Sequence, residues 1–129
     1  MNRPTPLHDQ LDWHRRTLAG ERVPRVEDEP ECGWFSRQFV KNGPRVPVRI
    51  YLEQVIDPET GELDEPEVLR CEVLGQAADP VAIWPFCRAI SEADFHDLTD
   101  KHIRDDLMMR ATHAPIDLTE NPTRPPKGV

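Results

Sequence analysis

Apolar and polar residues alternate along two stretches of the chain, a period of two that is typical of strands with one buried face. The stretches are residues 46–55 and 68–74, and both are predicted to be β-strands. The predicted inward positions are Val46, Val48, Ile50 and Leu52 in the first strand and Leu69, Cys71 and Val73 in the second.

An earlier apolar stretch, residues 34–40, is followed by Asn42-Gly43. Asn-Gly readily adopts the positive backbone angles of a tight turn, so residues 34–55 are predicted to form a β-hairpin. Residues 57–61 have the composition of a turn, and Gly75 closes the last strand. The sequence therefore predicts an antiparallel meander of at least three strands.

Two helices are predicted at the ends of this meander. Thr5 is expected to cap a helix that starts at Pro6 and stops before Gly20, with Leu7, Leu11 and Leu18 on one face. Ser91 resembles the start of a capping box for a second helix, from Glu92 to about Arg110. Its predicted inward residues are Phe95, Leu98, Ile103, Leu107, Met108 and Ala111. Between sheet and helix, Asp79-Pro80 predicts one short helical turn.

The predicted fold class is α+β: a small, bent antiparallel sheet of three to four strands with an N-terminal and a C-terminal helix. An SH3-like arrangement of the strands is one form that this sheet could take. The predicted organisation is an N-terminal helix at 1–20, a linker at 21–32, one α+β domain at 33–112 and an extended proline-rich tail at 113–129. A chain of 129 residues with 14 prolines fits one small core with long connections.

Charge is unevenly distributed along the chain, whose net charge is -8. Residues 34–50 hold four bases and no acid, whereas residues 51–106 hold fifteen acids and four bases. Such segregation bears on partners more than on fold. The negative total argues against a general DNA coat, because phosphate binding is driven by Lys and Arg.

The basic hairpin offers one candidate site. Its bases are interleaved with aromatic residues, a composition that could follow a nucleic-acid backbone and stack its bases. The alternative is that these bases pair with the acidic half of the chain or with a partner protein. The candidate residues are Arg37, Lys41, Arg45, Arg49 and Tyr51.

The acidic residues offer a second candidate site, because a row of carboxylates can imitate nucleic-acid phosphates and block a basic protein. An ordinary solvated helix face is the alternative. The candidate residues are Asp94, Asp97, Asp100, Asp105 and Asp106 on the predicted helix and Glu62, Asp64 and Glu65 in the preceding loop.

No strong catalytic, metal or cofactor motif is present in the sequence. His96 and His102 are six residues apart, on different helix faces, so no metal site is predicted. His14 is expected to be packed and hydrogen-bonded. Cys32, Cys71 and Cys87 lack a CxxC pair and are expected to be free thiols in a reducing cytoplasm. No segment reaches the ~18 apolar residues of a membrane span.

Several stretches resemble a group of short, uncharacterised proteins of tailed bacteriophages and prophages of proteobacteria. The stretches are WHRRTLAGE, GWFSRQFVKNGPRVPVRIY, CEVLG with ADPVAIW, ISEADF and HAPIDLT, and the block from Gly33 to Ile50 is the most specific. The resemblance spans residues 13–122, although the DPETGELDEPE loop is longer than in typical members. The group has no assigned activity, so no catalytic residue is carried over.

The resemblance implies a phage setting, in the host cytoplasm or on the virion. The predicted function is a non-enzymatic protein that binds a phage or host protein, as an accessory factor in phage development or as an inhibitor of the host protein. The alternative is nucleic-acid binding by residues 34–50. No cofactor is expected, and the sequence does not predict an oligomeric state.

Overall fold

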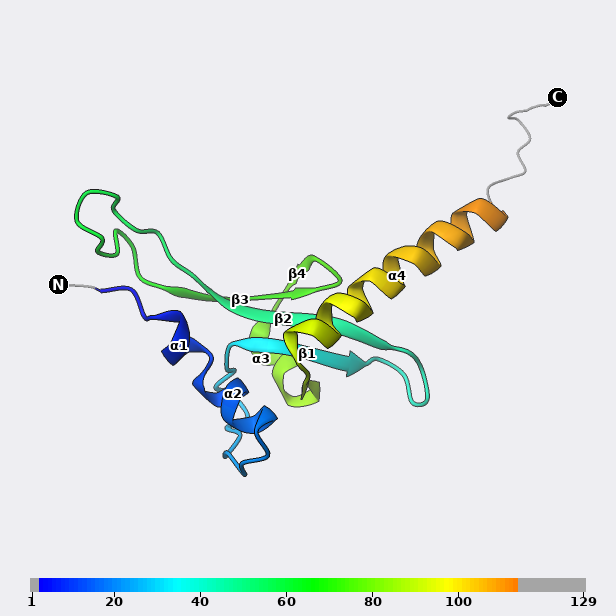
Figure 1. The fold of residues 1–129 in the computed structure, drawn as a ribbon, viewed down its shortest axis with the longest axis horizontal. Coiled ribbons are helices and arrows are strands. Elements are labelled where there is room, and N and C mark those ends of the chain that lie inside the picture. The colour runs from blue at the N-terminus through cyan, green and yellow to red at the C-terminus, as the bar shows by residue number, and fades with distance from the viewer. Residues whose placement is uncertain (1–2, 114–129) are drawn as a thin grey trace. The chain divides into compact units, whose positions relative to one another are not determined.

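The computed structural model describes residues 3–113 and divides the chain into two compact units, Met1–His96 and a second that begins at Asp97 (Figure 1). The first unit contains the sheet and all helices but the last. The last helix, α4 (Glu92–His113), begins in the first unit and continues into the second.

The sheet is antiparallel and has five strands in the order β4-β3-β2-β1-β5, which confirms the predicted α+β class. It is open, with β4 and β5 at its edges, and does not close into an SH3-like barrel. With the two short edge strands the sheet has five strands, more than the three to four that were predicted. The strands are β1 (Gly33–Gln38), β2 (Arg45–Glu53), β3 (Val68–Val73), β4 (Gln76–Ala78) and β5 (Arg88–Ala89).

The turn after β3 explains the extra strand β4. Leu74 and Gly75 both have positive φ, 52° and 79°, as in the two-residue turns that fit the twist of a hairpin. Val73 therefore pairs directly with Gln76. Gly75 does not end the meander but turns it back along β3.

The predicted hairpin is formed by β1 and β2, with Phe35 opposite Val48 and Gly33 opposite Ile50. Its loop is longer than a two-residue turn, because Gln38 and Arg45 form the last pair. Within the loop the Gly43 N–H donates to the Val40 carbonyl at 2.9 Å, and Asn42 has the expected positive φ of 62°.

The single N-terminal helix was predicted wrongly, because the chain bends at Leu11 and forms α1 (Leu7–Gln10) and α2 (Asp12–Leu18). Thr5 does not cap the helix. Its hydroxyl donates to Glu67 Oε1 at 2.8 Å instead, and Pro6 occupies the N-cap position. The stop at Gly20 is confirmed by backbone bonds from Gly20 to Thr17 and from Glu21 to Arg16, both 3.1 Å.

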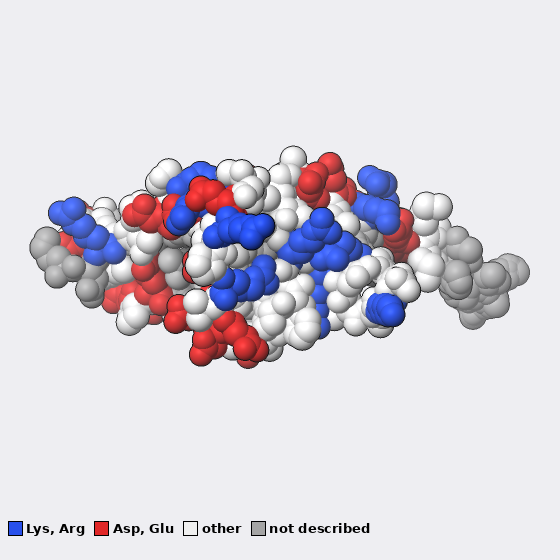
Figure 2. All heavy atoms as spheres, turned by 90° about the horizontal axis from the view of Figure 1, so that it is seen from below, with Lys and Arg blue, Asp and Glu red and all other residues white. Residues whose placement is uncertain are grey.

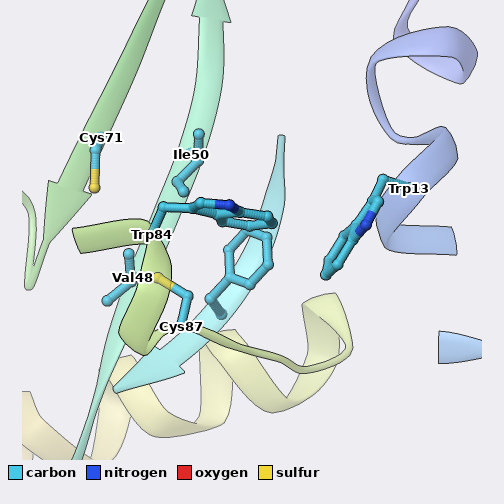
Figure 3. Close-up of a cluster of buried hydrophobic side chains, with 7 residues drawn as sticks. Trp13, Val48, Ile50, Cys71, Trp84 and Cys87 are labelled. Carbon is cyan, nitrogen blue, oxygen red and sulfur yellow. The ribbon is translucent and has the colours of Figure 1, made fainter. Parts of the chain in front are cut away.

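The face by which α2 packs also differs from the prediction. Leu7 and Leu18 are exposed, whereas Trp13 and His14 are buried. Trp13 meets the ring of Trp84 edge-on at 5.0 Å, and Trp84 meets Phe35 in the same way at 5.6 Å. An aromatic cluster thus determines the orientation of the helix (Figure 3).

This cluster is the core of the sheet's inner face, defined here as the face that bears Phe35, Val48, Ile50 and Cys71. Trp84 is supplied by two short turns, α3 (Pro80–Ile83) and η1 (Trp84–Phe86). The predicted start of α3 is confirmed, since the Asp79 side chain accepts a hydrogen bond from Val81 N at 3.1 Å.

Residues 21–32, which were expected to be a linker, are bound to the same cluster. The indole N–H groups of Trp13 and Trp84 donate to the carbonyls of Pro24 (3.0 Å) and Val26 (2.8 Å). The guanidinium of Arg25 stacks 4.4 Å from the Trp84 ring and donates to the Trp84 carbonyl. These contacts fix the segment along the aromatic core.

Helix α4 starts where it was predicted, with Ser91 Oγ accepting from Asp94 N at 3.0 Å. The prediction of its inward face was wrong, because only Phe95 and Leu98 are half-buried. The physical reason is that its apolar residues do not form one stripe along the helix. The exposed ones are Ile103, Leu107, Met108 and Ala111.

Candidate binding surfaces

The basic residues predicted on the hairpin do not share one surface. The register places Arg37 opposite Val46 on the inner face, and Arg49 opposite Trp34 on the outer face. Arg45 also lies on the outer face, where its Nε donates to Ser36 Oγ at 2.7 Å. Lys41 is exposed in the loop between the strands.

On the outer face, Arg49 lies beside both aromatic and acidic neighbours. Its guanidinium is 4.9 Å from the Tyr51 ring, and its cross-strand neighbour on β3 is Glu72. The Tyr51 hydroxyl donates to Glu72 at 3.4 Å, and desolvation together with this carboxylate raises the pKa of Tyr51.

Within residues 3–113, Arg37, Lys41 and Arg49 form no ion pair with a carboxylate, so the alternative of internal pairing is not realised for them. Carboxylates of the acidic half form ion pairs with bases of the same half instead, as Glu53 does with Arg70 at 2.8 Å. Figure 2 shows basic side chains gathered near the middle of one face, with acidic side chains beside them.

Arg37 occupies a distinct site, which we name the aromatic clamp and define by Arg37, Phe39 and Phe86. The centre of its guanidinium lies 4.2 Å from the Phe39 ring and 4.6 Å from the Phe86 ring. Both rings are on the surface, with exposed fractions of 52% and 59%. Arg37 Nε is buried and has no hydrogen-bond partner among the described residues.

A groove lies elsewhere on the first unit, between α1, α2, the start of β1 and the end of β2. Two adjoining cavities of about 640 and 480 Å³ form it and share Leu7, Leu11, Trp34 and Glu92 as lining residues. The larger cavity also contains Arg49 and Tyr51, and the smaller one Leu18. The leucines that do not pack on the core therefore line this groove.

The N-terminal wall of the groove is fixed by the carboxylate of Glu67. Thr5 donates to it through its backbone N–H and its hydroxyl, both at 2.8 Å, and the Gln54 amide also donates. These hydrogen bonds lower the pKa of Glu67, because they favour the charged carboxylate.

The predicted acidic residues are mostly exposed but do not form an uninterrupted row. Lys101 and Arg104 lie at helical spacing among Asp97, Asp100 and Asp105, and Lys101 pairs with Asp105 at 3.8 Å. Asp94 and Asp106 are exposed on the same helix. Glu62, half-buried, and the exposed Asp64 and Glu65 belong to the loop between β2 and β3 in the first unit.

The groups with potential catalytic chemistry are separated or buried. No group of three or more His, Cys, Asp or Glu residues in 3–113 is arranged to hold a metal ion. His14 is buried as expected, and its Nε2–H donates to the carbonyls of Trp34 (2.9 Å) and Ile90 (2.7 Å). His96 is exposed beside Glu92.

The three cysteines are free and buried in the structure. Burial raises the pKa of Cys32 and Cys71 to about 11 and that of Cys87 to about 12. A thiol with such a pKa is protonated near neutral pH and is a poor nucleophile. The cysteines therefore contribute to packing.

Sequence reasoning identified Arg37 but missed Phe86 as its neighbour. Phe86 is far from the hairpin in sequence and reaches Arg37 only because η1 packs on the inner face. The alternation of Phe35, Arg37 and Phe39 was an available signal that Arg37 faces inward.

In the described part of the chain, no helix has the length and apolar character of a membrane span. Comparison of the chain with protein-family models, curated proteins and solved structures found no match.

Proposed function

We propose that this chain is a non-enzymatic binding protein that acts through protein–protein interaction, with the aromatic clamp as its contact surface. The observation that supports the proposal is the pair of half-exposed phenyl rings in contact with one guanidinium. Arginine and aromatic residues are enriched at protein interfaces, and a few such residues supply most of the binding energy.

The apolar area that the clamp exposes is large enough to contribute substantially to the free energy of binding a partner. A phenylalanine that is about half exposed leaves on the order of 100 Å² of apolar surface in water, and covering it contributes about 2–3 kcal/mol. Val40, next to Phe39, is 64% exposed and extends the apolar surface. The rings are also held in place by the stacked arginine, so less side-chain entropy is lost on binding.

The resemblance to phage proteins suggests the biological setting of this binding. The proposed role is an accessory function in phage development or the inhibition of a host protein, in the host cytoplasm. Because Lys101 and Arg104 interrupt the acids of α4, the aromatic clamp supports this role better than acidic mimicry does.

Nucleic-acid binding by the hairpin is supported less well. A phosphate backbone is bound by several bases on one surface, whereas Arg37 lies on the face opposite to Arg45 and Arg49. The net charge of -8 opposes the approach of a polyanion.

The test compares two pairs of exposed apolar residues. Phe39→Ser/Phe86→Ser removes the clamp, and Leu7→Ser/Leu18→Ser removes comparable apolar surface from the groove. Each tagged variant is used for affinity purification from phage-infected bacteria with quantitative mass spectrometry, after circular dichroism and thermal melting have shown that it is folded.

A protein enriched by the wild type and by the leucine variant, but lost with the clamp variant, is the expected result. Equal recovery of all interacting proteins with the clamp variant would refute the proposal. Loss with the leucine variant alone would assign binding to the groove instead.

A further inference from the structure

Arg37 is held in a way that leaves its hydrogen-bonding edge for a ligand. Phe39 and Phe86 lie 4.2 and 4.6 Å from the guanidinium centre. The faces of these rings offer no conventional hydrogen-bond acceptor, so the contacts leave the N–H donors of the guanidinium for another acceptor. Arg37 Nε is already shielded from water and has no acceptor among the described residues.

The charge of Arg37 is not neutralised by a carboxylate of the described residues. In residues 3–113 it forms no ion pair, and its cross-strand neighbour on β2 is Val46. The positive charge of Arg37 is therefore available to an external anion.

The groups around the guanidinium indicate which anion fits. Phe39, Val40 and Phe86 are all more than half exposed, so the ligand must bring apolar surface next to its negative charge. A planar carboxylate matches the edge of a guanidinium with two parallel hydrogen bonds. A protein segment with an acidic residue beside an apolar one offers both features. A nucleic acid also has stacking surface beside its charge, but its repeated phosphates require several bases on one surface, and Arg45 and Arg49 lie on the opposite face.

We infer that Arg37 binds a carboxylate of the partner protein, an aspartate or glutamate, while an apolar side chain adjacent to that carboxylate packs on Phe39 and Phe86. This inference rests on the proposed function and adds to it the chemistry of the partner. It makes Arg37 the residue that selects acidic segments.

The direct test is a titration of the isotopically labelled protein, followed by NMR at the Nε–H resonance of Arg37. The probes are the acetylated and amidated tripeptide Leu-Glu-Phe and its Leu-Gln-Phe isostere, which differ only in the carboxylate. The glutamate peptide is expected to shift this resonance saturably and to bind at least about tenfold more tightly than the glutamine peptide, a difference of about 1.4 kcal/mol.

Two variants with the same change in charge separate this site from general attraction. Arg37→Gln should remove the preference for the glutamate peptide, whereas Arg49→Gln, on the opposite face of the hairpin, should retain it. Arg37→Lys, which keeps the charge but loses the planar fork, should give an intermediate preference. Equal binding of both peptides to the wild type, or an equal loss in both glutamine variants, would overturn the inference.

A third probe, a twelve-residue oligothymidylate, tests the competing class of ligand. Tighter binding of this oligonucleotide than of the glutamate peptide at Arg37 would overturn the inference in favour of nucleic acid. Weaker or absent binding supports a protein carboxylate.

Affinity purification with Arg37→Gln distinguishes failure of the inference from failure of the proposed function. A partner that is lost with the Phe39→Ser/Phe86→Ser variant but retained with Arg37→Gln would leave protein binding intact and refute carboxylate recognition. A partner retained with both variants would refute the clamp as the contact surface. Loss with both variants supports both proposals.

Discussion

Replacement of Gly33 by alanine tests the closest approach between α2 and the sheet. A Cβ added at Gly33 would lie 2.6 Å from His14 Cγ and 2.9 Å from His14 Cβ, and closer still to Cδ2. Non-bonded carbon atoms are most stable about 3.5–4.0 Å apart, so the ring would have to move by roughly 1 Å. The imidazole is not free to move, because its Nε2–H bonds two carbonyls.

The expected cost follows from these contacts. A displacement of about 1 Å breaks or weakens two hydrogen bonds, each contributing about 0.5–1.5 kcal/mol, and leaves buried polar groups poorly satisfied. Together with the repacking of the ring, we expect Gly33→Ala to destabilise the fold by about 2–4 kcal/mol. In urea, with a slope of about 1.5 kcal/mol per molar, the midpoint should fall by about 1–2.5 M.

The assay is urea denaturation of four variants: Gly33→Ala, His14→Ala, the double variant that combines them, and Gly75→Ala. Gly75→Ala is the matched control for backbone strain, since Gly33 and Gly75 both have positive φ, +156° and +79°, but Gly75 has no atom within 4 Å of an added Cβ. It should cost about 1 kcal/mol from backbone strain alone. Adding His14→Ala to Gly33→Ala removes the ring, so the double variant should be at least about 1 kcal/mol more stable than the sum of the single effects predicts.

A loss below about 0.5 kcal/mol in Gly33→Ala, or single effects that add within that margin, would refute the reasoning. The first outcome would mean that the backbone opens without cost. The second would mean that the methyl group and the imidazole do not compete for the same space.

Two further predictions concern the N-terminal segment and the β3–β4 turn. The pKa of Glu67 is lower in the folded state than in the unfolded state, where it is near 4.5. The stabilisation from its hydrogen bonds with Thr5 is therefore complete above the unfolded pKa and is lost as the pH falls through the folded pKa. The protection factor of the Thr5 amide, which is its intrinsic exchange rate at each pH divided by the measured rate, should therefore fall on acidification, and Glu67→Gln should have a low protection factor at neutral pH; a pH-independent protection factor in the wild type would contradict this. Leu74 has φ +52°, which asparagine tolerates better, so Leu74→Asn should raise the free energy of unfolding by about 0.5–1 kcal/mol; an unchanged or lower melting temperature would refute the strain.

The features that the sequence predicted correctly depend on neighbouring residues. Alternation along β2 and β3 requires one face to be buried, and the structure buries Val48, Ile50 and Cys71 there. The caps at Asp79 and Ser91 and the stop at Gly20 involve bonds that span at most five residues. Such local chemistry can be recognised without knowledge of the tertiary fold.

The errors arose where distant segments compete for the same contact. The leucines of the N-terminal helices were expected to be buried, but Trp13 offers more apolar area and finds Trp84 and Phe35 as partners. The hydroxyl of Thr5 is satisfied by Glu67, 62 residues away, instead of by its own helix. Periodicity identifies an apolar face but not the surface that will cover it.

The fold separates basic residues that are close together in the sequence. Arg37 and Arg49 belong to the same basic segment, yet the two-residue period of β1 and β2 places them on opposite faces. Arg49 has Glu72 as a cross-strand neighbour, whereas Arg37 contacts two phenyl rings. The surroundings of each guanidinium, and not the number of bases in the segment, therefore determine which arginine can bind an external anion. If this is correct, Arg37→Gln and Arg49→Gln, which change the net charge equally, must have unequal effects on binding.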